Sequence, residues 1–384
     1  MLRDVRRPAA DRSAYREREN TGRNEGRRVY DEIEESFAAG DHRGAQRRLR
    51  RLLEGSRPPS ERRLRRLCGM CRTLRRRDRI PDYTLLATEL HRHLFADDSG
   101  LAPIVEGGMH AFCGHVDRAD GAFVKVVDDG GVEARFYRLV LDGELPWKGA
   151  RYQVTRPHSA EVIGTLSVLR LEAIAGDFAK STGSAVFTNR KRVIAAARAI
   201  AEFNAQITMA GRPAPEAVPL PLVPLRLDTK HDAHLGARLA GRADLDAILD
   251  THRQLQESWD RITGHMQPFT WAIANNDFHP GNFIAGKRFT LVDNGASCFA
   301  PLGNDLYSLI VHNIDNPELR EDVIAAYCDQ LRDCGVHADP DQVRFAANVA
   351  YCKRYMKMRP HTTTDNPATF LDAQAVAQRL LQAT

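Results

Sequence analysis

Apolar side chains recur every three or four residues along much of the N-terminal quarter of the chain, which predicts amphipathic helices. One run ends at Gly40, the next begins at Asp41, and a third apolar stripe follows Ser60. Glycine is a common residue just after a helix, and aspartate and serine are favoured helix N-caps. We therefore predict that residues 23–95 are helical, whereas the polar and aperiodic residues 1–22 form a disordered arm.

From about residue 96 the pattern changes to short apolar runs separated by glycine, which is typical of strands and turns. The runs LAPIVEGG, AFVKVV and IGTLSVLRLEAIAG predict strands, and VEARFYRLVLDG predicts a helix between them. Beyond residue 176 the pattern is again mostly helical. This order predicts an α+β, bilobal protein: a small antiparallel-sheet N-lobe over 96–175 and a mainly helical C-lobe over 176–384, preceded by a basic helical region.

Charge is divided unevenly along the chain. Residues 1–95 carry 25 Lys and Arg against 15 Asp and Glu, whereas the remainder carries 30 against 35. A dense group of arginines could bind phosphates of a nucleic acid or an anionic membrane, or dock an acidic partner, or form a solvated face. No aromatic residues that could stack on bases are interleaved with it, which disfavours nucleic acid. The group comprises Arg47, Arg48, Arg50, Arg51, Arg62, Arg63, Arg65 and Arg66.

Other classes of protein are disfavoured by what the sequence lacks. No run reaches the roughly 18 to 20 apolar residues that cross a bilayer, and the N-terminus lacks the apolar segment of a secretory signal, so we expect a cytoplasmic protein with no transmembrane segment. Seven cysteines, an odd number, do not indicate a disulfide framework. Cys68 and Cys71 share a helical face with Leu64, Leu67 and Leu74, which predicts core packing rather than a metal or redox site.

The stretch NNDFHPGNF, residues 275–283, directly follows the strand-like run TWAIA. A second short strand then delivers Asp293 sixteen positions after Asp277, and Asn282 lies five positions after that first acid. Two acids separated by a hairpin, together with this amide, supply a base and two oxygen ligands for a hard cation such as Mg²⁺. Phosphoryl transfer from ATP requires these groups.

This loop resembles the HGDLHPGN signature of the aminoglycoside phosphotransferase and choline kinase family, whose members have a protein-kinase-like fold. The residues that match it position by position are Asp277, His279, Pro280, Gly281 and Asn282. The following LVDNGASCFAPLGNDLYSLI is similar to the family's IDWE…G…DLA block. The resemblance covers about residues 100–315, is strong over 272–309, and implies ATP and Mg²⁺ as cofactors.

The resemblance also implies roles for individual residues. Asp277 would orient or deprotonate the substrate hydroxyl, Asn282 and Asp293 would bind Mg²⁺, and the buried Asp305 and His279 would brace the loop. The nucleotide contacts that it implies are the following: Lys125, Gly107 and Gly108 at the phosphates, Glu133 as the partner of Lys125, and the backbone of Glu172, Ala173 and Ile174 at the adenine.

Several features depart from the family pattern, among them the glycine-rich loop GGMHAFCG, which is a loose match. Asn275 replaces the histidine two places before the catalytic aspartate, and its amide can still bond the backbone. Lys125 and Glu133 are only eight positions apart, which leaves their pairing open. The helix that ends in Leu-His in the family ends in Phe203 and Asn204 in this chain.

The acceptor is expected to be small. Asp293 and Asp305 are separated by eleven residues, too few to seat a peptide in the manner of a protein kinase. Residues 211–270 contain no acidic cluster, and CKRYMKMRP is basic, so a sugar, an amino alcohol, another metabolite alcohol or an anionic acceptor is favoured over a polycationic antibiotic. Two alternatives stay open: a pseudokinase or scaffold that acts through the basic helices, and a binder of nucleic acid or anionic membrane. The oligomeric state is also open.

Overall fold

The computed structural model describes residues 28–54, 60–95, 101–103, 113–117, 120–174, 189–227, 240–279, 282–311, 313, 316–355 and 367–384. The predicted arm over 1–22 lies outside these residues. The chain forms two compact units, the first comprising Met1–Asp128 with Ile163–Val168 and the second Asp129–Val162 with Leu169–Thr384. No helix in the described part of the chain is long and apolar enough to cross a membrane.

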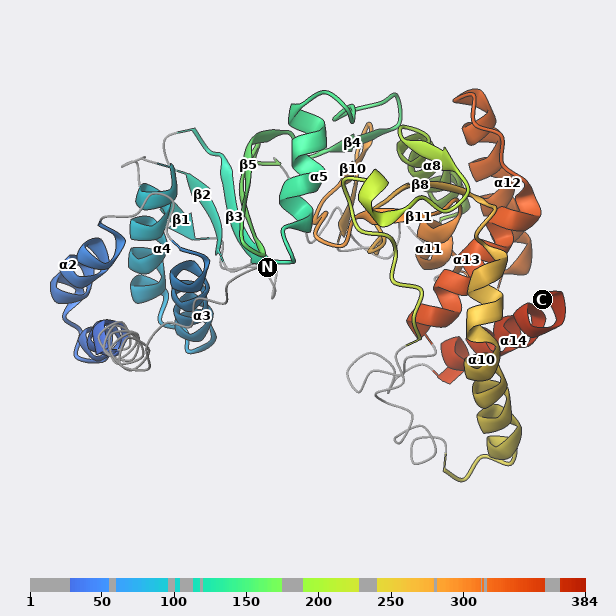
Figure 1. The fold of residues 1–384 in the computed structure, drawn as a ribbon, viewed down its shortest axis with the longest axis horizontal. Coiled ribbons are helices and arrows are strands. Elements are labelled where there is room, and N and C mark those ends of the chain that lie inside the picture. The colour runs from blue at the N-terminus through green and yellow to red at the C-terminus, as the bar shows by residue number, and fades with distance from the viewer. Residues whose placement is uncertain are drawn as a thin grey trace, which may run out of the picture. The chain divides into compact units, whose positions relative to one another are not determined.

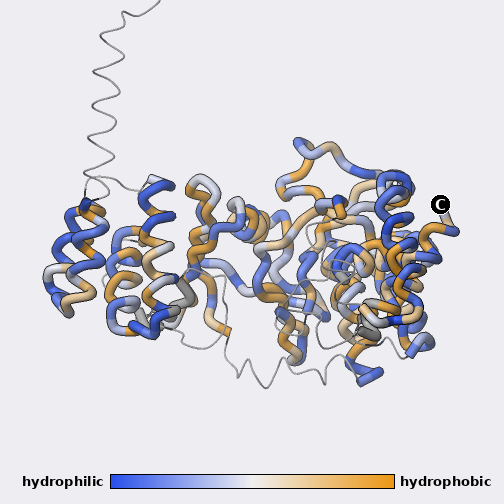
Figure 2. The backbone as a smooth tube through the Cα atoms, turned by 90° about the horizontal axis from the view of Figure 1, so that it is seen from below, coloured by the Kyte–Doolittle hydropathy of each residue, from blue (hydrophilic) through white to orange (hydrophobic). Residues whose placement is uncertain are grey.

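The first unit begins with helices, as the apolar periodicity predicts (Figure 1). A helix over residues 28–38 is followed by α2 (His42–Leu53), α3 (Glu61–Arg76) and α4 (Ile80–Phe95). The predicted caps are confirmed: Gly40 has a φ of 73°, the Asp41 carboxylate accepts from Gly44 N, and the Ser60 hydroxyl accepts from Arg63 N. In Figure 2 these helices alternate between hydrophilic and hydrophobic positions within each turn.

A five-stranded sheet follows the helices in the chain, in the order β1-β2-β3-β6-β5. Its strands are β1 (Leu101–Pro103), β2 (Cys113–Asp117), β3 (Phe123–Asp128), β5 (Pro157–Ile163) and β6 (Leu166–Leu171). The first three strands pair antiparallel in chain order. The glycine-punctuated runs therefore form strands, as their pattern predicts.

One hydrophobic core joins the helices of the first unit to its strands. The helices contribute Phe37, Leu49, Leu67 and others, and the strands contribute the fully buried side chains Val124, Val126, Leu166 and Val168. The predicted core positions of Cys68 and Cys71 are confirmed, because both side chains are buried within this cluster. The basic helices and strands β3 and β6 therefore share a single core.

The second unit is rich in helix. Its helices are α5 (Val132–Leu141), α8 (Arg190–Asn204), α10 (Leu245–His265), α11 (Tyr307–Val311), α12 (Pro317–Asp333), α13 (Pro340–Tyr355) and α14 (Pro367–Ala383). Short 3₁₀ turns occur at η1 (Pro215–Ala217) and η3 (Asn304–Leu306).

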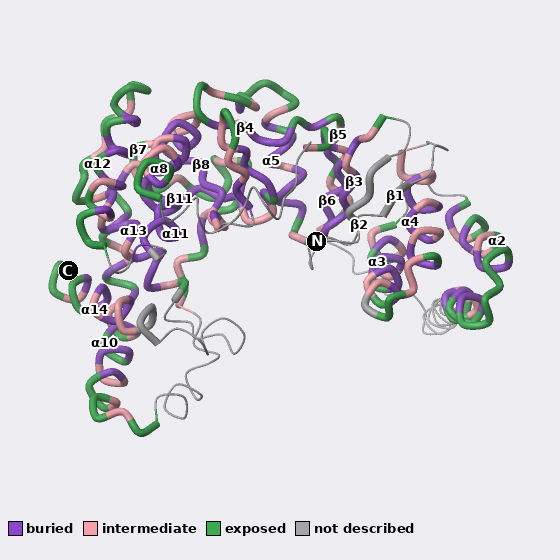
Figure 3. Tube along the Cα trace, turned by 180° about the vertical axis from the view of Figure 1, so that it is seen from behind, coloured by how far each residue is buried: buried purple, intermediate pink, exposed green. Residues whose placement is uncertain are grey.

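Two three-stranded sheets lie among these helices. In the first, β10 (Phe289–Leu291) pairs antiparallel with β9 (Phe283–Ala285) and parallel with β4 (Tyr152–Val154). In the second, β8 (Thr270–Ala274) lies between β11 (Cys298–Pro301) and β7 (Thr208–Ala210), with both pairs antiparallel. Figure 3 shows β8 and β11 as buried. The predicted catalytic loop leaves the end of β8, and Asp293 follows β10.

Candidate active site

The predicted catalytic loop begins where β8 ends, and a buried carboxylate holds its backbone. Asp305, in η3, accepts hydrogen bonds from Asn275 N at 3.0 Å and from Asn276 N at 2.8 Å. Its side chain is almost fully buried, with 1% exposed. Burial raises the pKa of Asp305, while the hydrogen bonds that it accepts act in the opposite direction. The acid therefore fixes the direction in which the chain leaves the strand.

A chain of buried polar groups reaches Asp305 from two helices. Asn204, the last residue of α8, donates through Nδ2 to Asp305 Oδ2 at 3.1 Å and to Ile273 O at 2.7 Å. The Tyr327 hydroxyl, from α12, donates to Asn204 Oδ1 at 2.8 Å and accepts from Gly303 N. Asn204, one of the positions that depart from the family pattern, thus supports the loop through its hydrogen bonds to Asp305 and Ile273 O.

Asn275 ties the loop to the segment that carries Asp293. Its Nδ2 donates to Asn294 Oδ1 at 2.9 Å, and its Oδ1 accepts from Asp277 N at 3.2 Å. Asn275 is 1% exposed, so both bonds are shielded from water. An amide in this position can donate to one segment and accept from the other at the same time.

The β9–β10 hairpin brings Asn282 next to the strand end that carries Asp293. Val292 N donates to Asn282 O at 3.1 Å, which extends the pairing of Leu291 with Phe283 by one step. Two residues near this junction have left-handed backbone despite not being glycine: Asn276, with a φ of 58°, and Asp293, with a φ of 57°. Such strained positions are concentrated at functional sites.

Asp277 is part-exposed, with 27% of its side chain accessible, and its carboxylate accepts hydrogen bonds from two side chains and lies near a third. Asn282 Nδ2 donates to Oδ2 at 3.2 Å and to the backbone oxygen at 3.1 Å. His279 Nε2 lies 3.7 Å from Oδ2. Arg354, from the last turn of α13, donates to Oδ1 at 2.8 Å. The sequence alone indicates Asn282 and His279; it includes Arg354 only as part of the basic stretch CKRYMKMRP and does not indicate this contact.

The oxygens that the sequence predicts as Mg²⁺ ligands belong to Asn282 and Asp293. Because Asn282 Nδ2 faces Asp277, its Oδ1 is the side-chain atom left for a cation. Asp293 is exposed at the end of the hairpin. Within the described residues no three His, Cys, Asp or Glu side chains are grouped so as to hold a metal ion. One carboxylate and one amide oxygen fit Mg²⁺, which commonly binds one or two carboxylates together with phosphate oxygens and water.

Glu133 contacts the backbone beside Asp293. Its Oε1 accepts from Asn294 N at 3.2 Å, and the side chain is 1% exposed. A Cβ atom at Gly295 would lie 3.4 Å from Asp129 Oδ2 and 3.7 Å from oxygens of both Glu133 and Asp293. Asp129, which the sequence analysis missed, also accepts from Glu133 N at the start of α5. Its signal is the DDGG run before a helix, which is typical of capping.

The other predicted nucleotide contacts are Lys125, Gly107, Gly108, Glu172, Ala173 and Ile174. Lys125 is a buried residue of β3 in the first unit, and Gly107 and Gly108 lie outside the described residues. Glu172 and Ala173 are exposed and Ile174 is half-buried directly after β6. Glu172 N donates to Arg156 O at 2.7 Å. Their roles, and the pairing of Lys125 with Glu133, stay predictions.

Solved structures of choline kinase-like proteins and aminoglycoside phosphotransferases resemble this chain. A choline/ethanolamine kinase family protein from Mesorhizobium loti is 16% identical, with a TM-score of 0.42 over 74% of this chain and 91% of the other. Aminoglycoside phosphotransferase APH(3'')-Id from Streptomyces rimosus, solved with ADP and streptomycin, is 16% identical, with a TM-score of 0.40 over 70% and 97%.

Choline kinase LicA from Streptococcus pneumoniae is 13% identical, with a TM-score of 0.38 over 74% of this chain and 94% of the other. No protein-family model and no curated protein sequence matches this chain. The assignment of a function therefore rests on the residues of the site and their geometry.

A cavity in the described part of the second unit has a lining that does not include Asp277. It encloses about 640 Å³ between the start of α8 and the tip of the β9–β10 hairpin. Its lining includes the cations Arg151, Lys191, Arg192 and Lys287. We take the loop rather than this cavity as the candidate active site, because the oxygen donors and the strained backbone are at the loop.

Proposed function

We propose that this protein is an ATP- and Mg²⁺-dependent phosphotransferase that moves the γ-phosphate of ATP to a hydroxyl of a small molecule. The observation that carries the proposal is the junction of the loop and the hairpin. There a part-exposed carboxylate, Asp277, is hydrogen-bonded to Asn282, whose backbone pairs with Val292, the residue before the exposed Asp293. These are the groups that phosphoryl transfer requires from a protein.

In the proposed reaction Asp277 accepts a hydrogen bond from the acceptor hydroxyl and holds its oxygen in line with the γ-phosphorus. The new oxygen–phosphorus bond forms as the bond between the γ-phosphorus and the bridging oxygen breaks, ADP leaves with that electron pair, and Asp277 takes the hydroxyl proton. Mg²⁺, held by Asn282 Oδ1 and Asp293, would neutralise charge on the phosphates. Asp305 acts through Asn275 and Asn276, whose N–H groups it holds.

The nucleotide contacts belong to the same proposal. Lys125, Gly107 and Gly108 bind the phosphates, and Glu133 pairs with Lys125. The backbone of Glu172, Ala173 and Ile174 contacts the adenine. The burial of Glu133 and its bond to Asn294 N support a structural link between this acid and the Asp293 segment.

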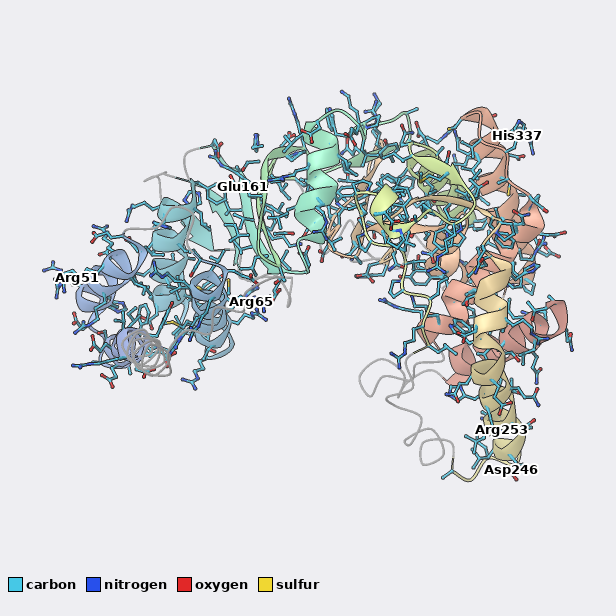
Figure 4. All side chains as sticks on the ribbon, in the orientation of Figure 1. Arg51, Arg65, Glu161, Asp246, Arg253 and His337 are labelled. Carbon is cyan, nitrogen blue, oxygen red and sulfur yellow. The ribbon has the colours of Figure 1, made fainter. Side chains whose placement is uncertain are left out.

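The proposal is tested by ADP release from purified protein with Mg²⁺, ATP and a panel of alcohols. Asp277→Asn should lower turnover by roughly 10²- to 10⁴-fold, the usual range for a proton-transferring group, while thermal stabilisation by Mg²⁺ and ATP persists. Asp246→Asn is a matched control, because Asp246 is an exposed acid at the start of α10 (Figure 4). Equal activity in Asp277→Asn and wild type would refute the proposal.

A second candidate is a pseudokinase that binds nucleotide and acts through the basic helices. The observation that favours it is Arg354, which occupies Oδ1 of the proposed base. Stabilisation by nucleotide without turnover of any alcohol in the panel would favour this candidate.

Binding of nucleic acid or anionic membrane by α2 and α3 is the third candidate, and internal ion pairs weaken it. Arg50 bonds the buried Glu89 at 3.0 Å, Arg65 bonds Glu61 at 3.0 Å, and Arg66 lies 3.3 Å from Asp31. Arg51 projects away from α2 in Figure 4. Steeply salt-dependent binding by the full chain would support this candidate.

A further inference from the structure

Arg354 is the contact of the proposed base that the proposed chemistry does not explain. It lies in the last turn of α13, where a cation is favoured by the helix dipole whatever its partner. Its side chain, however, is 45% exposed and reaches Asp277 Oδ1 at 2.8 Å, with its guanidinium 5.7 Å from the centre of the Tyr307 ring. The helix therefore delivers a positive charge to the oxygen that an acceptor hydroxyl would need.

We propose that the acceptor is an anionic alcohol, one that carries a carboxylate or a phosphate near the reacting hydroxyl, and that Arg354 binds this anionic group. The inference rests on the proposed function and names the substrate class of the same site. Arg354 is then a specificity-determining residue: the anionic group draws the guanidinium away from Asp277 Oδ1, and the hydroxyl takes the place that it leaves.

Hydrogen-bond geometry limits where the anionic group can be. The hydroxyl oxygen would lie about 2.7 Å from Oδ1, and an anionic oxygen about 2.8 Å from a guanidinium nitrogen. Because the nitrogen is now 2.8 Å from Oδ1, a small rotation of the Arg354 side chain reaches an anionic oxygen roughly 3 to 6 Å from the hydroxyl oxygen. This is the separation found in hydroxy acids, sugar acids and phosphorylated short alcohols.

The charges around Asp277 disfavour the opposite class of acceptor. Its carboxylate accepts hydrogen bonds from Arg354 and from the Asn282 amide, and His279 Nε2 lies 3.7 Å away. An ammonium group beside the hydroxyl would be repelled by Arg354, and would compete with it for Asp277. A carboxylate or phosphate there is attracted, and a guanidinium can bind either with two parallel hydrogen bonds.

The same contact predicts how the enzyme behaves without an acceptor. While Arg354 occupies Oδ1, a water molecule has less access to this atom than an acceptor that can release the arginine. We therefore expect slow hydrolysis of ATP in the absence of an anionic alcohol, and we expect Arg354→Gln to hydrolyse ATP faster than wild type.

The test uses sets of alcohols that differ only in charge, for example glycerol, glycerate, glycerol 3-phosphate and 3-amino-1,2-propanediol. Wild type should have a higher kcat/KM for the anionic members. Comparison of glycerate with glycerol 3-phosphate then identifies whether a carboxylate or a phosphate is preferred. Arg354→Gln should lose roughly 10- to 100-fold of this preference, mainly as a rise in KM, as expected for a hydrogen bond to a charged group. Arg354→Lys should retain part of it.

Arg344→Gln is the matched control, because Arg344 lies on the same helix and bonds Glu321 and Asp341 instead. It should keep the preference unchanged. Preference for a neutral or ammonium alcohol, or an anion preference that survives in Arg354→Gln, would overturn the inference. In either case Asp277-dependent turnover would leave the proposed function standing.

Direct measurement of acceptor binding tests the inference even when no turnover is observed. Calorimetric titration of wild type and Arg354→Gln with glycerate and glycerol 3-phosphate, in the presence of Mg²⁺ and ADP, does not require turnover. Weaker binding to Arg354→Gln than to wild type supports an anionic acceptor even if no phosphate is transferred. Absence of phosphate transfer together with such binding would count against the proposed function and not against this inference. Equal binding, or none to either protein, overturns the inference.

Discussion

At the scale of single residues, Asp305 and Asp293 are two acids of one site with opposite environments. Asp305 is buried and accepts from Asn204 and two backbone N–H groups. Asp305→Asn would turn an amide NH₂ toward those donors, so we expect a loss of roughly 1 to 3 kcal/mol in the free energy of unfolding. Urea unfolding of wild type and variant would measure it.

Asp293→Asn is the comparison within the same site. Asp293 is exposed, and asparagine also tolerates the left-handed backbone that this residue adopts. We expect its free energy of unfolding to stay within about 0.5 kcal/mol of wild type, while Mg²⁺-dependent ADP release falls. A large stability loss in Asp293→Asn, or none in Asp305→Asn, would contradict the assignment of a chemical role to one acid and a supporting role to the other.

Gly303 is the residue directly before η3, the short 3₁₀ turn that contains Asp305. Its φ is 97°, and a Cβ atom there would lie about 2.4 Å from Val343 O, inside any normal contact distance. Gly303→Ala should therefore destabilise the protein by more than the roughly 1 kcal/mol cost of the backbone conformation alone. Gly335→Ala isolates that backbone cost, because Gly335 has a φ of 79° with no atom within 4 Å of the added methyl group. Similar thermal midpoints for the two variants would contradict the expectation.

The residues that the sequence predicts are those with a local signature. Asp277, Asn282 and Asp293 are spaced by one loop and one hairpin, and the structure brings Asn282 beside the end of that hairpin. Arg354 lies 77 positions from Asp277 along the chain, and neither its neighbours nor its helical position indicate that contact. Only the packing of α13 determines it.

At the scale of elements, the first turn of α8 carries charges that the helix dipole disfavours. Its first turn contains Arg190, Lys191 and Arg192 and no acid, although the positive end of the helix dipole favours anions there. We expect Lys191→Glu to raise the free energy of unfolding by roughly 0.3 to 1 kcal/mol, measured by urea unfolding at low ionic strength. The gain should shrink as salt is added.

Two variants separate the causes of that gain. Lys191→Gln removes the charge without reversing it and should yield a smaller increase. Lys287→Glu relieves repulsion within the same cationic cavity from the hairpin, without acting on the helix dipole. If Lys287→Glu stabilises as much as Lys191→Glu, repulsion within the cavity rather than the dipole is responsible.

The helices were more predictable than the small sheets. The ends of the first helices follow from Gly40, Asp41 and Ser60, which act on their own neighbours. Strands β7 and β11 have three and four residues, and each is defined by its pairing with β8. Runs of this length carry too little periodicity to be recognised, so their pairing depends on the surrounding structure.

At the scale of the whole molecule, the first unit contains a buried acid, Glu89, that is hydrogen-bonded to three side chains. Burial would raise the pKa of Glu89, but hydrogen bonds from Arg50, Gln46 and Arg92 outweigh it and lower this pKa below its ordinary value of 4.5. A lowered pKa in the folded state stabilises the protein above that value, and the contribution is lost as the pH falls through the folded pKa.

The expected outcome is a pH-dependent difference between wild type and Glu89→Gln. At pH 7 the variant should be less stable by roughly 1 to 3 kcal/mol, and the difference should narrow as the pH falls below about 4.5. Thermal unfolding followed by circular dichroism between pH 3 and pH 7 would measure it. Glu61→Gln is the control, since Glu61 pairs with Arg65 at a part-exposed position. A difference that widens in acid would contradict the sign.

The change of pattern near residue 96 marks a change of secondary structure, but apolar contacts continue across it. Leu67 and Leu86 belong to the same cluster as Val124 and Leu166, residues that are far apart in the sequence. Periodicity reports which face of each element is apolar and gives no information on which elements meet there. The extent of the core could therefore not be predicted from the sequence.

This shared core has a consequence for any shortened version of the protein. A polypeptide starting after Phe95 would keep β3 and β6 but lose the helices that cover Val124, Val126, Leu166 and Val168. Four apolar side chains on a sheet would then face water, and such surfaces promote self-association. The arginine-rich helices cover the apolar face of this sheet, so we expect their removal to yield aggregates rather than a shorter folded protein.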